Sequence, residues 1–287
     1  MFFVLLINIL IIGAGYGLMA MGFAFMCSVS PFFNLTLGSI IALGAYGTYA
    51  LTSLAGLPAA FAIPVSICLC AVLSALLERF IYTPFRLKGA SSMVLLVVSL
   101  GLYTISEALI HLSFGPQYQI LGGVLIENMN LGFFSIPKIQ FLTIVADFVV
   151  FAVLNMLLFH TFFGKTIRAV NDNPKLADIT GLNNNKIILI VSAIAGMILG
   201  LSGVLTGFDT GLEPTMGFNL LFKGIIAAII GGMSTMKGPF LGAFFLAAAE
   251  NIGVLALSSE WRDLVAFVIF TLFLMFRPNG IFEKKEK

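Results

Sequence analysis

Long apolar stretches alternate with short segments of Gly, Pro, Asn or charged residues along almost the whole chain. No Asp, Glu, Lys, Arg or His occurs before Glu78, and an apolar segment of that length must hold several membrane spans of about 20 residues each. The pattern predicts an all-α polytopic membrane protein with about eight or nine membrane segments, some of which are interrupted by Gly or Pro and need not cross fully. The predicted limits are 2–27, 34–55, 57–77, 91–112, 139–160, 187–207, 218–236, 238–257 and 263–277.

Composition agrees with this class. Of the 287 residues, 60% are hydrophobic and 10% are charged, whereas a soluble domain carries about 25% charged residues. The net charge of +2 gives no support to nucleic-acid binding. Because the N-terminus lacks the basic region of a signal peptide, we expect residues 2–27 to be the first span.

Positive charge orients the predicted spans. Lys and Arg are concentrated in segments 78–90 and 161–186 and in the C-terminal tail, so we expect these three segments in the cytoplasm. The opposite side then receives 113–138, 208–217 and 258–262, where acidic residues outnumber basic ones. This topology places the N-terminus outside the cytoplasm.

A polar island at 164–181 is the largest concentration of charge before the tail. It contains the signals that begin and end a helix: Asn173 as N-cap, Pro174 at the first helical position and Gly181 just past the end. These residues predict a helix over 174–180 of about two turns, roughly 10 Å long. Such a helix is too small to be a domain and suits the groove of another protein.

Two segments of the chain echo each other. Residues 33–42 and 218–227 both begin with Phe-Asn-Leu and align without a gap, and the predicted topology runs them in opposite directions. Opposed copies of one element indicate an inverted repeat, as in many transporters. Chance similarity between two apolar stretches is the alternative.

Glu107, Asp147, Lys223 and Glu250 are charged residues that fall within apolar stretches. A charge in the hydrocarbon is expensive, so these side chains should face the protein interior or water and mark a pathway or a subunit contact. Glu107 and Asp147 could instead lie near helix ends. Lys223 either extends toward the outer interface or pairs with Glu250.

Motifs for catalysis are not persuasive. The sequence 164–166, Gly-Lys-Thr, imitates the end of a P-loop, but the required glycine five residues before it is Phe159. His111 and His160 are isolated, and the cysteines lack metal-ligand spacing. We therefore expect no enzyme activity, no metal site and no cofactor in this chain.

The island resembles the cytoplasmic coupling segment of LivH-type permeases, the membrane subunits of branched-chain amino acid ABC importers. Resemblance extends over nearly the whole chain and includes the C-terminal pattern at 277–282. The matching positions are 78–80, 84–86, 114–115, 164, 167–169, 173, 177, 181–182, 204–207, 214, 217, 223, 231–232, 238, 242, 250 and 277–282.

The resemblance implies that residues 1–287 form a single transmembrane permease domain with a cytoplasmic coupling loop at 161–186. It implies a place in the cytoplasmic (inner) membrane of a bacterium or archaeon. The implied partners are a homologous LivM-type permease, two LivG/LivF-type ATPases, a periplasmic or extracellular solute-binding protein and membrane lipid. ATP hydrolysis would belong to the separate ATPase subunits.

Two groups of site residues are expected. The expected ATPase-coupling residues lie in and beside the helix at 174–180 and are Arg168, Asn173, Pro174, Lys175, Ala177 and Gly181. The translocation pathway is expected to run near the two Phe-Asn-Leu segments, and its expected residues are Asn34, Gly38, Lys223, Gly224, Gly231 and Glu250. A bulky residue at position 177 is expected to uncouple transport without removing the protein from the membrane.

The chain departs from the family pattern in three places. Leu37 replaces the usual histidine, Ser234 stands where glycine is usual, and Thr83 stands where arginine is usual. Leucine, isoleucine and valine therefore share the list of candidate solutes with urea, amides and other small polar molecules. A gradient-driven secondary transporter, a channel and a purely structural subunit are the alternatives from other classes, and none of them needs a helix that docks onto ATPases.

Overall fold

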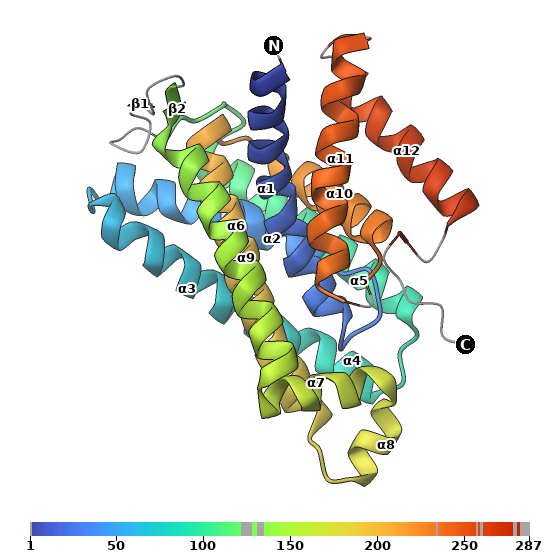
Figure 1. The fold of residues 1–287 in the computed structure, drawn as a ribbon. Helices are drawn as coiled ribbons and strands as arrows, with labels where there is room; N and C mark the ends of the chain where they lie inside the picture. Colours follow the sequence, from blue (N-terminus) through green and yellow to red (C-terminus); the bar gives the residue numbers. More distant parts are fainter. Residues whose placement is uncertain are drawn as a thin grey trace.

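The computed structural model is a bundle of helices that run between two opposite ends (Figure 1). It describes residues 2–121, 128–130, 135–233, 235–256, 258, 261–277 and 280–281. In these ranges, seven helical stretches are long and apolar enough to cross a membrane. The predicted class, an all-α polytopic membrane protein, is confirmed.

Each predicted membrane segment corresponds to a helix. The helices are α1 Phe2–Cys27, α2 Thr36–Tyr49, α3 Ala59–Leu77, α5 Ser92–Phe114, α6 Lys138–His160, α9 Asn184–Thr210, α10 Met216–Gly231, α11 Lys237–Ala256 and α12 Arg262–Phe276. Helix α10 ends five residues earlier than predicted, because the chain turns at Gly232, whose φ of +88° suits glycine. At 16 residues, α10 is about 24 Å long and shorter than the hydrocarbon core of about 30 Å.

The segment at 78–90, which was expected in the cytoplasm, is helical over most of its length. Helix α3 continues through a π-helical turn, η2 Glu78–Tyr82, into α4 Thr83–Leu87. Glu78 is buried and forms an ion pair with Arg86, with 2.9 Å between Oε1 and the guanidinium nitrogen. This pair bridges η2 and α4 and stabilises the helical extension. A second π-helical turn, η1 Ala50–Leu54, extends α2.

Two small structures lie at opposite ends of the bundle. Helices α7 Phe162–Asp172 and α8 Pro174–Ile179 project at one end. The antiparallel strands β1 Asn128–Asn130 and β2 Ser135–Pro137 lie at the other end, near the N-terminus (Figure 1). A bridge between Gln119 and Leu212 joins the two loops that were expected to share a side. The arrangement agrees with the predicted placement of the N-terminus opposite the island, although helix α7 was not predicted.

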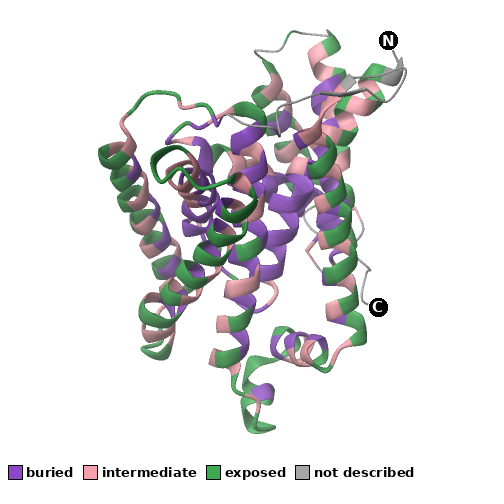
Figure 2. Cartoon of the chain, turned by 90° about the vertical axis from the view of Figure 1, so that its left-hand side faces the viewer, coloured by how far each residue is buried: buried purple, intermediate pink, exposed green. Residues whose placement is uncertain are grey.

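Burial divides the helices into a centre and a periphery. In α9, 67% of the most apolar window is buried, compared with 22% in α3, α5 and α6. Figure 2 shows buried residues through the middle of the bundle and exposed residues on the outer helices. In a membrane the outer apolar faces meet lipid, so α9 with α1, α2 and α10 forms the packed centre.

Small residues allow the central helices to approach closely. A Cβ atom on Gly203 of α9 would overlap the backbone carbonyl of Ile41 in α2, and Gly200 contacts the backbone of α2 at Gly44. Ser74 of α3 donates a hydrogen bond of 2.8 Å to the carbonyl oxygen of Ser192 in α9. Backbone contact and buried hydrogen bonds are the usual means of helix association in lipid, where apolar side chains alone give little net attraction.

Substitution of Gly203 tests the close packing of α2 against α9. Gly203→Leu should force α2 and α9 apart and destabilise the fold by about 1–3 kcal/mol or more, because the added side chain meets backbone that cannot yield. The amount of monodisperse protein extracted from membranes measures the effect. Gly101→Leu is the matched control, since a Cβ there meets nothing within 4 Å. Equal yields of the two variants would contradict the close α2–α9 contact.

Candidate functional site

A cavity of about 680 Å³ lies between α1, α6, α9, α10 and α12. It occupies the half of the bundle that contains the ends of α9 and the beginnings of α10 and α12, away from α7 and α8 (Figure 1). Most of its lining is apolar, with a few polar groups among the aliphatic and aromatic side chains, which is the composition of many small-molecule sites. The charged residues of the lining are Asp209, Lys223, Arg262 and Asp263.

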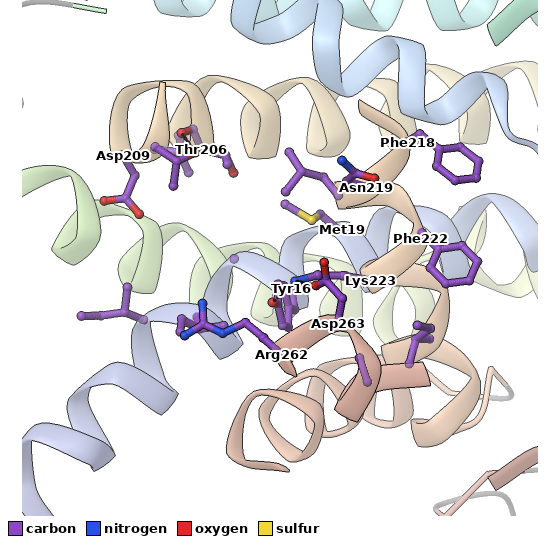
Figure 3. A pocket seen from close by; sticks show the side chains of 18 of the residues that line it. Tyr16, Met19, Thr206, Asp209, Phe218, Asn219, Phe222, Lys223, Arg262 and Asp263 are labelled. Atoms are coloured by element: carbon purple, nitrogen blue, oxygen red, sulfur yellow. Dashed lines mark hydrogen bonds and ion pairs between the residues drawn. The ribbon is translucent and has the colours of Figure 1, made fainter. Parts of the chain in front are cut away.

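Lys223 is the centre of a polar cluster beside this cavity (Figure 3). Its Nζ donates to the Tyr16 hydroxyl at 3.1 Å and lies 2.9 Å from Asp263 Oδ1 and 3.8 Å from Glu250 Oε1. The Tyr16 hydroxyl in turn donates to Glu250 Oε2 at 2.8 Å. We call Tyr16, Lys223, Glu250 and Asp263 the Lys223 cluster.

The Lys223 cluster explains how charges are tolerated inside the spans. The Glu250 side chain is fully buried, the Lys223 side chain is 20% exposed, and the Asp263 side chain is 75% exposed. A buried carboxylate without a counter-charge would be strongly unfavourable, and Lys223 supplies that charge. Pairing with Glu250 was one of two alternatives for Lys223, and the structure contains that ion pair.

Only one of the expected pathway residues lines the cavity, and this is Lys223. Glu250 lies behind it and acts through the Lys223 cluster. Asn34 is buried away from the cavity, where its Oδ1 accepts hydrogen bonds from the Thr36 backbone N–H at 3.1 Å and the Tyr82 hydroxyl at 3.0 Å. These hydrogen bonds hold the backbone at the start of α2, so Asn34 has a structural role in this conformation.

The three expected pathway glycines are also packing positions. A Cβ on Gly38 would crowd the carbonyl of Gly217, the residue that directly precedes the second Phe-Asn-Leu segment. A Cβ on Gly224 would crowd Met19 of α1, and one on Gly231 would overlap the carbonyl of Gly238. None of the three lines the cavity. The inverted-repeat relation between the two segments stays a prediction.

Three residues that complete the site were not predicted from the sequence. Tyr16 reads as an ordinary aromatic residue in an apolar span, Arg262 was the last residue of a predicted loop, and Asp263 was the first residue of the predicted span that follows. The sequence signal that could have found Arg262 and Asp263 is a charged pair at the start of an apolar stretch. Charged side chains at that position can point into the bundle as well as toward water. Asp209 was assigned to a loop, but it lies near the end of α9 and its Oδ1 accepts from Gln140 at 2.9 Å.

Asp147 faces the protein interior, as expected for an ionisable residue within a membrane span. It is fully buried in the middle of α6 and faces Gly17 of α1, where a Cβ would overlap its carboxyl group. Neither carboxyl oxygen has a hydrogen-bond partner among the described residues. Placement near a helix end is therefore wrong for this residue.

Helix α8 forms as its capping residues predicted. Asn173 Oδ1 accepts hydrogen bonds from the backbone N–H groups of Lys175 and Leu176, both at 3.1 Å. Gly181 follows with a φ of +85°, and Pro174 begins the helix. The observed range, Pro174–Ile179, agrees with the predicted 174–180 to within one residue.

The two faces of α8 differ in how far their side chains are exposed. Ala177 is 3% exposed and packs into the core cluster beneath the helix. Leu176 and Ile179 are 59% and 80% exposed, and Lys175 is also exposed. The Ala177 side chain is turned toward its own chain, and the coupling role expected for this residue stays a prediction. Arg168 of α7 lies over the ring of Phe159, 5.2 Å from its centroid.

The second prediction tests the Lys223 cluster. Lys223→Met should destabilise the protein by about 3–5 kcal/mol, because it leaves Glu250 buried without its counter-charge. The double variant Lys223→Met/Glu250→Gln should recover most of this loss. Thermal unfolding of the purified protein measures both. A double variant no more stable than the single one would contradict a direct coupling between the two residues.

Comparison with known proteins agrees with this architecture. The family described as branched-chain amino acid transport system / permease component matches residues 5–274. The high-affinity branched-chain amino acid transport system permease protein BraD of Pseudomonas aeruginosa is 26% identical over 98% of this chain and 95% of its own length. The corresponding LivH of Escherichia coli is 23% identical over 96% of this chain and 93% of its own length.

Two further similarities are to proteins that are not named for branched-chain amino acids. The autoinducer 2 import system permease protein LsrC of Yersinia pseudotuberculosis is 28% identical over 56% of this chain and 50% of its own length. A chain in the solved structure of PsaBC from Streptococcus pneumoniae in complex with Fab shares the fold, with a TM-score of 0.55 and 15% identity over 96% of this chain and 92% of that chain. The family match covers nearly every helix of the bundle, and this chain belongs to the family of permease components of branched-chain amino acid transport systems.

Proposed function

We propose that this chain is the membrane permease subunit of an ATP-driven importer that carries branched-chain amino acids across the cytoplasmic membrane of a bacterium or archaeon. The observation that carries the proposal is the family match over residues 5–274. Relatives named for high-affinity branched-chain amino acid transport align with the chain over nearly their whole lengths. The chain itself performs no hydrolysis, which belongs to separate ATPase subunits.

The proposed assembly contains two permeases. This chain supplies half of the membrane pathway, and a homologous permease supplies the other half. A solute-binding protein delivers the amino acid at the end of the bundle that carries the cavity. Two ATPases bind at the opposite end, where α7 and α8 project (Figure 2).

Helix α8 is the proposed contact with an ATPase. Leu176 and Ile179 expose apolar side chains on α8, at 59% and 80% exposure. Burying such side chains in a groove is favourable by about 25 cal/mol for each Å² removed from water. Asn184 of α9 donates to the backbone carbonyl of Pro174 at 2.8 Å, so a displacement of α8 reaches α9 directly. Closure of the ATPases changes the relative free energies of the two access states through this contact.

Departures from the family pattern bear on the identity of the solute. Leu37, Thr83 and Ser234 depart from the family pattern, and one similar protein is named for autoinducer 2 import. Urea and short amides are therefore the alternative solutes within the same class of importer. A gradient-driven transporter is the alternative from another class, and it gives no role to the exposed apolar side chains of α8.

Uptake measurements test the function. Cells that lack this gene should regain uptake of labelled leucine when the wild-type chain is restored, and ATP depletion should abolish that uptake. A protonophore applied with ATP held constant should leave most of the leucine uptake unchanged. Loss of uptake with the protonophore alone would contradict the importer class. Restored uptake of urea or an amide, without leucine, would keep the class and replace the solute.

Substitutions in α8 test the docking contact. Leu176→Glu and Ile179→Glu should each lower leucine uptake by about tenfold or more, because a charge enters an apolar contact, while the amount of protein in the membrane stays unchanged. Leu87→Glu is the matched control, because Leu87 is 72% exposed at the end of α4, outside the island. Wild-type uptake by both α8 variants would remove α8 as the contact.

A further inference from the structure

The cavity beside Lys223 contains unused hydrogen-bonding capacity. Arg262 Nε is buried and has no hydrogen-bond partner among the described residues. Asp263 is 75% exposed and pairs with Lys223 through one of its two oxygens. The Arg262 side chain also lines the cavity, so its guanidinium group is placed to meet a ligand that carries an acceptor group.

Charge in the lining is balanced. Lys223 and Arg262 supply two positive charges, and Asp209 and Asp263 supply two negative charges. Glu250 lies behind Lys223 and adds a further negative charge, which Lys223 partly neutralises. Both signs of charge therefore face the cavity, and a solute that carries one charge of each sign can meet an opposite charge at each end.

Geometry separates the charged region from an apolar one. Figure 3 shows Arg262 and Asp263 beside Lys223 and Tyr16, whereas Phe218 and Phe222 lie at the far end of the cavity from Asp209. The ring of Phe222 lies 5.1 Å from that of Phe267, centroid to centroid. The volume of about 680 Å³ falls within the range of small-molecule sites, roughly 300–1,000 Å³.

We propose that this cavity is a solute site within the permease, which binds an amino acid zwitterion with an aliphatic side chain. Arg262 and Lys223 bind the carboxylate, Asp263 binds the ammonium group, and the apolar lining around Met19 and Phe222 contacts the side chain. This site rests on the proposed function and deepens it, since it assigns solute recognition to the permease in addition to the binding protein.

Ligand-induced stabilisation of the complete purified transporter, without binding protein, tests the site. Leucine at millimolar concentration should raise the Tm of the wild-type complex increasingly with concentration. Isoamylamine, which lacks the carboxylate, and 4-methylpentanoate, which lacks the ammonium group, should produce no shift at equal concentration. No shift with leucine, or equal shifts with all three compounds, would overturn the zwitterion site.

Substitutions of cavity residues test whether leucine raises the Tm by binding in this cavity. Arg262→Gln and Asp263→Asn should lose the leucine-dependent shift, whereas Arg79→Gln, a change of an exposed arginine on η2, should retain it. These variants are preferred to Lys223→Met because they leave the Lys223–Glu250 pair in place. A leucine shift of wild-type size in both Arg262→Gln and Asp263→Asn would place the ligand elsewhere and overturn the proposal.

Transport assays on the same complex distinguish failure of this site from failure of the proposed function on which it rests. With leucine-loaded binding protein, Arg262→Gln should lower the maximal uptake rate by about tenfold or more, with the half-saturating concentration of binding protein unchanged. ATP-dependent leucine uptake by wild type without any Tm shift would overturn the site and leave the function intact. A leucine-dependent shift without leucine uptake would support the site and contradict the function.

Discussion

Lys223 lies within an apolar membrane helix, and the groups that stabilise its charge come from three other helices. Tyr16 belongs to α1, Glu250 to α11 and Asp263 to α12. Tyr16 and Glu250 are 234 positions apart, so their hydrogen bond connects the two ends of the chain. Low solvation inside a membrane makes each of these contacts depend on the others. The arrangement of the C-terminal helices around α1, and the cavity between them, depend on this cluster.

Helix α9 relates the cavity to the opposite end of the bundle. It begins at Asn184, which bonds to α8, and its last turns contribute Leu205, Thr206 and Asp209 to the lining of the cavity. Its 27 residues span about 40 Å as a single helix. Close contacts at glycines hold α9 against α2 and α3. A rigid element with one end at the proposed docking helix and the other at the cavity is suited to carry movement between them.

The parts of the fold that follow from local sequence were predicted. Apolar length located the membrane helices, and Asn173, Pro174 and Gly181 located α8. Contacts between distant residues were not predictable in this way. Hydropathy could not decide whether Lys223 reaches Glu250, nor show that Tyr16 lies between them. The charges of segment 78–90 predicted a place in the cytoplasm, but not the ion pair between Glu78 and Arg86 that stabilises a helix there. Helix α8 is too short for periodicity to assign its faces, so the inward direction of Ala177 required the structure.

Accessibility of the cavity in two nucleotide states tests the central claim, that the α8 end and the cavity end move together. A cysteine at Thr206, with Cys27, Cys68 and Cys70 replaced by alanine, would be labelled by a membrane-impermeant maleimide in the assembled transporter. The account predicts labelling rates that differ by about tenfold or more between nucleotide-free and ATP-trapped complexes, and no difference when Ile179→Glu is added. Equal rates in the two states of the transporter without the Ile179 change would contradict the coupling of the cavity to ATP.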